Sequence, residues 1–124
     1  MATTLSTAAR NAACDAVVDL VDAGVGAGKI RIKSAGGTVI AEVSLGDPAF
    51  GAAASGVATA NGLPLSGAGV AAAGAGTDAA TFDVTDSANT VVWSGGTAEL
   101  GLDNVSIADG QTVTVNTCTH TQPA

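Results

Sequence analysis

The stretch from Gly24 to Lys29 (GVGAGK) sets glycines in front of a lysine, which is the composition of a phosphate-binding loop. A Walker loop needs a glycine, four further residues, Gly-Lys and then Ser or Thr, because its backbone N–H groups enclose the phosphates and its hydroxyl holds Mg²⁺. Here Ala23 stands at the position of the first glycine and Ile30 at that of the hydroxyl. The dinucleotide form GxGxxG fails as well, since Lys29 replaces its third glycine. We therefore expect no nucleotide binding and interpret the stretch as a helix end and a connector.

Thiol or imidazole chemistry would have to use Cys14, Cys118 and His120, the two cysteines and the only histidine of the chain. Cys118 and His120 lie close together near the C-terminus. Two ligands do not close a metal site, however, and no neighbouring residue would orient the imidazole as a base. We expect His120 to lie in a C-terminal tail. The cysteines are predicted to be free thiols packed in the core, because disulfides are rare in the cytoplasm.

The acidic residues give no better candidate for a catalytic or metal site. Asp83, Asp86 and Asn89 could gather around one loop, but their order does not match a calcium-binding loop, and acidic turn residues commonly cap turns. A nucleophile paired with a base is not evident anywhere in the sequence. We therefore predict a protein that is not an enzyme and that carries no cofactor and no metal.

The most informative charges are Lys29, Arg31 and Lys33, three of the four basic residues, which alternate with Ile30 and Ile32. Because side chains alternate between the two faces of a strand, the three cations share the face opposite the isoleucines. Two interpretations stay open. One is an edge strand whose lysines discourage aggregation, and the other is a docking patch for an acidic partner. The three cations are therefore candidate partner-binding residues.

Length and composition limit the classes of function. The chain has 124 residues, the size of one domain, and a net charge of −7, which is a poor match for nucleic acid. Its apolar residues are mostly Ala and Val, with two Phe, one Trp and no Tyr, so few large side chains are available to line a deep pocket. No apolar run approaches the roughly 18 residues of a membrane span. The first residues do not resemble a secretory signal, so we expect folding in the cytoplasm.

One segment, about residues 4–23, has the periodicity of a helix. Its apolar residues recur at steps of three and four, and we expect this set to form the buried face: Leu5, Ala9, Ala13, Ala16 and Leu20. Asp15, Asp19 and Asp22 are expected on the far side. Val17 and Val21, with Cys14, form a second apolar flank. We predict that this flank is a partner contact in a homo-oligomer, a trimer or a dimer, because a core poor in aromatic residues gains from further apolar burial.

From residue 29 onward the apolar period changes to two. Apolar and polar residues alternate on both sides of the turn Ala35-Gly36-Gly37, and this pattern predicts a β-hairpin of residues 29–33 and 39–45. Further strands are expected at residues 57–60, around Val70, and at residues 80–85, 90–94, 100–107 and 112–117. About eight short strands between residues 29 and 119, followed by a short tail, predict a mainly β single domain of residues 1–124. The expected architecture is an antiparallel β-sandwich or jelly roll with one N-terminal α-helix.

Three phrases of the sequence are distinctive: LSTAARNAACDAVVDLVDAGVGAGKIRI, AEVSLGDPAFGAAASGVATANG and ELGLDNVSIADGQTVTV. They resemble a group of small structural proteins of tailed bacteriophages, over nearly the whole chain except residues 63–76. The resemblance implies a virion component, most plausibly a capsid decoration or cement protein on the outside of the phage head. Its implied partner is the major capsid protein, and the implied place of assembly is the host cytoplasm. The resemblance transfers no active-site residue.

Two other functions stay open at this point. One is a tail, neck or fibre component of the virion. The other is an extracellular carbohydrate-binding or adhesin-like β module, for which Trp93 would be the only tryptophan on which a sugar could stack. For every alternative we expect neither a nucleic-acid partner nor a membrane.

Overall fold

The structure is a computed structural model that describes residues 6–23, 26–46, 49–97 and 100–121. The chain begins with α1 (Thr7–Asp19), which continues as the 3₁₀ turn η1 (Leu20–Asp22). Ser6 caps the helix, since its hydroxyl oxygen accepts a hydrogen bond of 3.1 Å from the backbone N–H of Ala9. Leu5 and Gly24, which the sequence analysis names, lie outside the described residues.

The remaining elements are strands and one further 3₁₀ turn, η2 (Ala71–Ala73). The larger sheet has seven antiparallel strands in the order β6-β5-β1-β2-β4-β8, with β7 paired to β5. The smaller sheet pairs β3 with β9. The bounds of the strands are β1 (Lys29–Ser34), β2 (Val39–Ser44), β3 (Val57–Thr59), β4 (Leu65–Gly69), β5 (Thr77–Thr85), β6 (Val91–Gly96), β7 (Ser106–Ile107), β8 (Thr112–Val115) and β9 (Thr119–Thr121).

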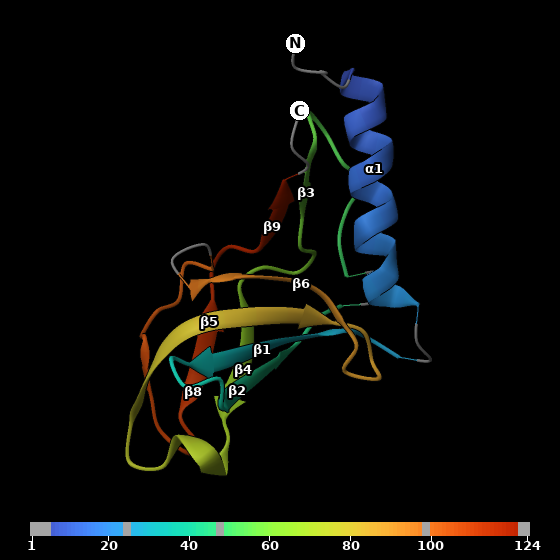
Figure 1. Ribbon diagram of the computed structural model, residues 1–124. Coiled ribbons are helices and arrows are strands. Elements are labelled where there is room, and N and C mark those ends of the chain that lie inside the picture. Colours follow the sequence, from blue (N-terminus) through green and yellow to red (C-terminus); the bar gives the residue numbers. More distant parts are fainter. Residues whose placement is uncertain (1–5, 24–25, 47–48, 98–99, 122–124) are drawn as a thin grey trace.

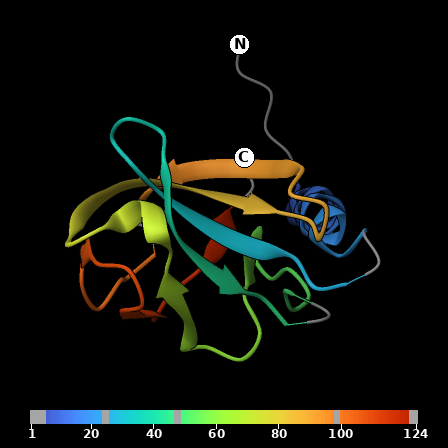
Figure 2. The ribbon, with the colours of Figure 1, turned by 90° about the horizontal axis from the view of Figure 1, so that it is seen from below.

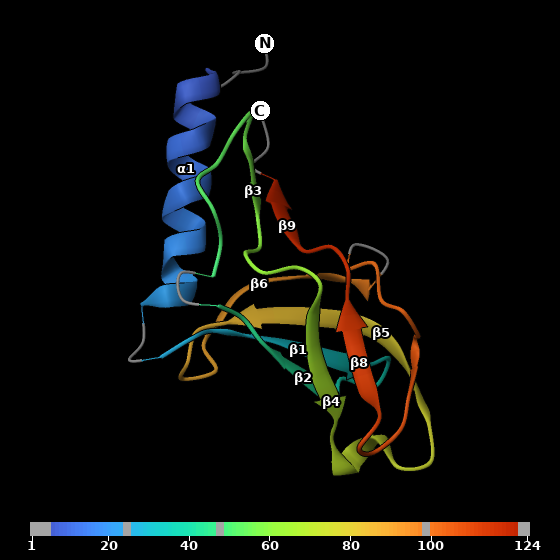
Figure 3. The same ribbon diagram turned by 180° about the vertical axis from the view of Figure 1, so that it is seen from behind.

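The coarse fold prediction is confirmed: the protein is mainly β, its sheets are antiparallel, and it has one N-terminal α-helix. Figures 1 and 3 show the curved large sheet below, with α1 and the small sheet standing above β6 at one end. The finer prediction of a sandwich or jelly roll is not confirmed. The hairpin of β1 and β2 is confirmed, with Ile30 opposite Val43 and Ile32 opposite Ala41.

The core is built from the inward side chains of these strands and from one face of the helix. Its largest members are Phe82, Ile30, Ile32, Ile40, Leu100 and Ile107, all almost fully buried. Two glycines explain why a strand forms in the low-complexity stretch around residue 67. A Cβ on Gly67 would collide with the carbonyl oxygen of Glu42, and one on Gly69 would collide with that of Ala108. Only glycine allows β4 to approach its neighbours so closely.

The predicted buried face of the helix is wrong. Cys14, Val18 and Val21 face the core, whereas Ala9 and Ala16 are exposed and the side chain of Leu20 is 55% exposed. Valine offers more apolar area than alanine, so burial of the valine flank is the more favourable choice.

Polar side chains beside that flank fix the rotation of the helix about its axis. The backbone N–H groups of residues 49–56 donate to them: Ala49 to Asp22 (3.0 Å), Ala53 to Asp15 (2.8 Å) and Gly56 to Asn11 (2.8 Å). This loop has little regular structure, so its N–H groups need such acceptors. Asp15 and Asp22 therefore face the loop rather than the far side of the helix.

Two other expectations also need correction. β1 lies in the centre of the large sheet, between β5 and β2, so it is not an edge strand. His120 does not lie in a tail, because it belongs to β9 and its Cα is paired with that of Ala58. Three residues are enough for this strand because the neighbouring β3 offers a complete antiparallel partner.

Candidate functional site

The three cations of β1 lie on one face of the sheet, as predicted, but each has a partner within the chain. The guanidinium of Arg31 pairs with the carboxylate of Glu42 on β2 at 3.1 Å. The ammonium of Lys33 pairs with the carboxylate of Asp83 on β5 at 2.6 Å. Lys29 donates to the side-chain oxygen of Asn89 at 3.2 Å. Lys29, Arg31 and Lys33 therefore present less free positive charge than the sequence alone indicates.

Asp83 is the centre of this polar network and is only 6% exposed. Burial alone would raise the pKa of its carboxyl. The hydrogen bonds from Lys33 and Ser94, with the positive charges of Lys33 and Arg31, outweigh burial and hold the pKa below its usual value. The hydroxyl of Ser94 on β6 donates to the Asp83 carboxylate at 2.6 Å. A single buried carboxylate thus ties β1 to β6 across β5.

The other acidic loop residues do not join Asp83 in a cation site. The carboxylate of Asp86 accepts hydrogen bonds from the N–H groups of Ala88 (2.9 Å) and Thr90 (3.0 Å), so it caps the turn between β5 and β6. Across the described ranges, no cluster of three or more His, Cys, Asp or Glu side chains is arranged to hold a metal ion. No helix in those ranges is both long and apolar enough to cross a membrane.

The structure places the second predicted contact, the flank of Val17 and Val21, mostly inside the protein. Val21 and Cys14 are fully buried, and Val17 is partly exposed. Val21 is therefore not available to a partner in this conformation. The exposed apolar side of α1 is the opposite flank, which ends at Leu20. Val91, at the start of β6, is a separate exposed apolar side chain and is 50% exposed. Figure 2 views α1 along its axis and shows it at one end of the large sheet.

Both cysteines are free and buried. Burial raises the pKa of the Cys118 thiol to about 12. Burial also raises the pKa of Cys14, against a hydrogen bond with the backbone of Ala58 that lowers it. The Cys14 thiol lies 3.4 Å from the carbonyl oxygen of His120, to which it donates. A protonated, buried thiol is a poor nucleophile and a poor metal ligand.

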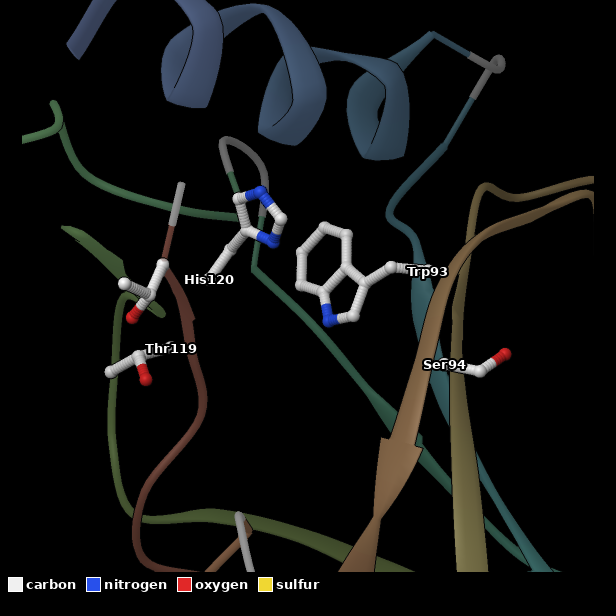
Figure 4. A pocket seen from close by; sticks show the side chains of 5 residues that line it. Trp93, Ser94, Thr119 and His120 are labelled. Carbon is white, nitrogen blue, oxygen red and sulfur yellow. The ribbon is translucent and has the colours of Figure 1, made fainter. Parts of the chain in front are cut away.

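The sequence prediction missed a site that Figure 4 shows, where aromatic rings from distant segments meet. The ring centroid of Trp93 on β6 lies 4.8 Å from that of His120 on β9 and 5.3 Å from that of Phe50. A pocket of about 540 Å³ opens here, lined by Trp93, Ser94, Thr119, His120 and Thr121. Nε2 of His120 is buried and has no hydrogen-bond partner among the described residues. The lone tryptophan is the only signal of this site in the sequence, because the three residues of β9 carry too little pattern to be distinguished from a tail.

Comparisons of the chain with protein-family models, with curated proteins and with solved structures find no match. The function must therefore be inferred from the residues and from the surfaces that they form.

Proposed function

We propose that the protein is a non-enzymatic structural protein of a phage virion. In this proposal it is a capsid decoration protein that binds the outside of the head and ties neighbouring major capsid subunits together. The resemblance of the three phrases to small phage structural proteins gives the class of protein. The surface of α1 gives the physical support, and this is the observation on which the proposal depends.

The helix is apolar on both of its sides. Its inner side consists of Cys14, Val18 and Val21, and its outer side carries exposed alanines and Leu20. The outer face of a surface helix is normally polar, and a helix that is apolar all round is normally buried. We define the docking face as Ala9, Ala16 and Leu20, which share one exposed side of the helix. On a protein of net charge −7, such a face is best explained by burial against another protein.

A decoration protein needs an interface of this kind. A contact with an apolar centre and a polar rim is typical of protein interfaces. Each contact can be weak, because repetition over a capsid lattice supplies avidity. A β body of the sandwich or jelly-roll type, as the sequence predicts, would suit a rigid tie between subunits.

The charged residues of β1 take a lesser place in the proposal. Lys29 has a neutral partner and Arg31 is partly exposed, so these two remain candidates for meeting acidic capsid residues. Lys33 is a weaker candidate, since its charge is committed to Asp83. Reversal of its charge would set two carboxylates against each other and could unfold the sheet, so docking experiments should leave Lys33 intact.

Association with copies of itself, as a trimer or a dimer, is part of the proposal. Val21 is buried and cannot be the contact between copies, and Val17 on the same flank is only partly exposed. Copies would sit on the capsid surface after assembly in the host cytoplasm.

The test compares Leu20→Gln with Thr38→Gln. Both positions are exposed and both variants gain the same uncharged side chain, but Thr38 lies in the turn between β1 and β2, away from the helix. Each variant would be mixed with particles that lack the protein, and the bound fraction would be measured. Loss of roughly half of a leucine's burial predicts a docking affinity about fivefold weaker for Leu20→Gln, with no change for Thr38→Gln. Equal binding of both variants would remove the docking face. Wild-type protein found only on tails would overturn the capsid location and favour the tail alternative.

A further inference from the structure

The outer edge of β9 carries backbone groups without partners among the described residues. The N–H of Ala60 donates to the carbonyl of Cys118 at 2.9 Å, and Thr59 is paired with Thr119. In an antiparallel pair, hydrogen-bonded and non-hydrogen-bonded positions alternate. The pair of Thr59 and Thr119 is therefore non-hydrogen-bonded. The carbonyl of Thr59 supports this assignment, because it accepts from Gly51 on the other side of β3 at 3.0 Å.

The same alternation applies along the rest of β9. Thr119 and Thr121 direct their N–H and C=O groups away from β3, whereas His120 directs its own toward β3. No backbone hydrogen bond of Thr119 or Thr121 to any other described residue is found. Figure 3 shows β9 at the outer margin of the small sheet, with β3 between it and the helix. The edge is therefore open for pairing.

The pocket lies against this open edge. Thr119, His120 and Thr121 form one wall, and Trp93 and Ser94 of β6 form the other. Its volume of about 540 Å³ is that of a ligand site rather than of a packing defect. None of the lining residues is an aspartate, glutamate, lysine or arginine. The hydroxyl of Ser94 is already committed to Asp83, on the opposite face of β6.

We propose that this pocket, which we call the slot between β6 and β9, binds an extended, uncharged peptide segment of a partner protein. The segment adds as a strand to the edge of β9. The free donors and acceptors are backbone groups two residues apart, which is the spacing that another strand presents. Three residues of β9 offer about 10 Å of edge at about 3.3 Å per residue, so about three residues of the segment pair directly. A charged segment would lose its solvation in a slot that offers no counter-charge. This inference goes beyond the proposed function, because it requires neither a capsid nor the docking face.

The experiment uses Trp93 as the reporter, since it is the only tryptophan of the chain and lies in the slot. The probes are acetylated, amidated pentapeptides in which Thr alternates with Val, Ile, Ala or Ser, titrated to millimolar concentration. Binding would be followed by the fluorescence of Trp93 and by the NMR signals of the Thr119 and Thr121 amides. We expect at least one peptide of the panel to shift both the fluorescence of Trp93 and the NMR signals of the two amides. Its version with alternate N-methylated amides should bind about tenfold more weakly, because it lacks the donors.

Variants of Thr119 separate backbone pairing from side-chain contact. Thr119→Pro removes an N–H that faces the slot, and proline is tolerated at such edge positions because the pairing with β3 does not use that N–H. We expect this variant to keep its melting temperature within a few degrees and to bind the best peptide about tenfold more weakly. Thr119→Val keeps the N–H, so its change in affinity measures the side-chain contact alone and should be smaller than that of Thr119→Pro.

Three results would overturn the proposal. One is that no peptide of the panel shifts the two amides. Another is that N-methylated and unmodified peptides bind equally. The third is that maltose shifts Trp93 while the peptides do not, which would assign the pocket to a hydroxylated ligand. If Thr119→Pro unfolds, the N-methylated peptide still decides the question with the wild-type protein. None of these results bears on the binding of Leu20→Gln to particles, which tests the proposed function. The two proposals can therefore be overturned independently.

Discussion

The two edge strands of the large sheet, β8 and β6, differ in how they are covered, and an aspartate contributes to the hydrogen bonding at each. At the β8 edge, residues 101–103 run alongside the strand. The N–H of Asp103 donates to the carbonyl of Thr114, and the Asp103 carboxylate accepts from the N–H of Thr114, both at 3.1 Å. Asn116 adds hydrogen bonds to Gly101 from its backbone (3.2 Å) and its side chain (3.0 Å). This edge is covered.

At the β6 edge, no other strand among the described residues pairs with the outer side. The aspartate here is Asp83, which lies behind the edge on β5 and holds Ser94 of β6 on the face away from the pocket. β6 has the sequence VVWSGG, with no charge and no proline, although exposed edges usually carry such residues to prevent aggregation. The chain therefore protects one edge with its own backbone and leaves the other available. The pocket, Val91 and the open edge of β9 all lie on the unprotected side.

The largest expected effect comes from loss of the anchor behind the open edge. Lys33→Met would leave the carboxylate of Asp83 buried with only the Ser94 hydroxyl as a nearby hydrogen-bond donor. Removal of one partner of a well-buried pair typically costs several kcal/mol. Since Lys33 is 27% exposed, we expect a loss of about 2 kcal/mol in the free energy of unfolding. Denaturation in urea would measure it, with Lys29→Met as the matched control, expected to change stability by less than about 0.5 kcal/mol.

The ion pair of Lys33 and Asp83 also predicts how the stability of the protein depends on pH in acid. Because the folded pKa of Asp83 lies below its unfolded value of about 4, the unfolded state takes up a proton first as the pH falls. The stability contributed by this carboxylate is complete above the unfolded pKa and is lost as the pH falls through the folded value. Lys33→Met removes part of that contribution, so its stability should fall less steeply with acid than that of the wild type. Parallel acid dependences would mean that Lys33 does not set the pKa of Asp83.

An intermediate effect is expected at the covered edge. Asp103→Ala removes the carboxylate that accepts from Thr114 and keeps the backbone hydrogen bond. Because the site is exposed, we expect a loss of about 1 kcal/mol. Urea denaturation would measure this against Asp78→Ala, which removes an exposed carboxylate from β5. Amide exchange should be faster at Thr114 in Asp103→Ala alone. Equal losses in both variants would show that Asp103 does not hold the covering segment.

The smallest change in stability is expected at the open edge. Val91 is 50% exposed, so Val91→Lys should alter the free energy of unfolding by less than about 0.5 kcal/mol. A lysine there would nevertheless oppose pairing of the open edge of β6 with another strand. Light scattering at high protein concentration should therefore detect less self-association than in the wild type. A destabilisation above 1 kcal/mol would instead show that Val91 belongs to the core.

The sequence predicts structure that depends on neighbouring residues, but it does not predict contacts between residues that are far apart along the chain. The hairpin of β1 and β2 follows from alternation around a glycine turn, so its register is encoded within a few residues. The partners of Lys33 and Arg31 are not local. They depend on which strands flank β1, and this order places Asp83 and Glu42 beside the cations.

The prediction of which face of α1 is buried was wrong for a related reason. Several apolar faces fit the helical period, and the choice between them depends on acceptors for the loop at residues 49–56. The pocket at Trp93 could not be predicted either, because it requires β9 and β6 to meet across the fold. A three-residue strand has too little pattern to be distinguished from a tail.

The hydrogen bonds that Asn11 and Asp15 of α1 and Asp22 of η1 accept from the loop at residues 49–56 also have a mechanical consequence. Asn11, Asp15 and Asp22 are spread along the helix and hold one continuous segment. That segment is paired with β3 through the bridge between Phe50 and Ala60. A force applied to the helix along its axis would load these bonds in parallel, as shear, rather than opening them one after another. A partner that pulls on α1 would therefore pull on the β body as a whole, and the joint would resist load with greater strength than any single bond in it.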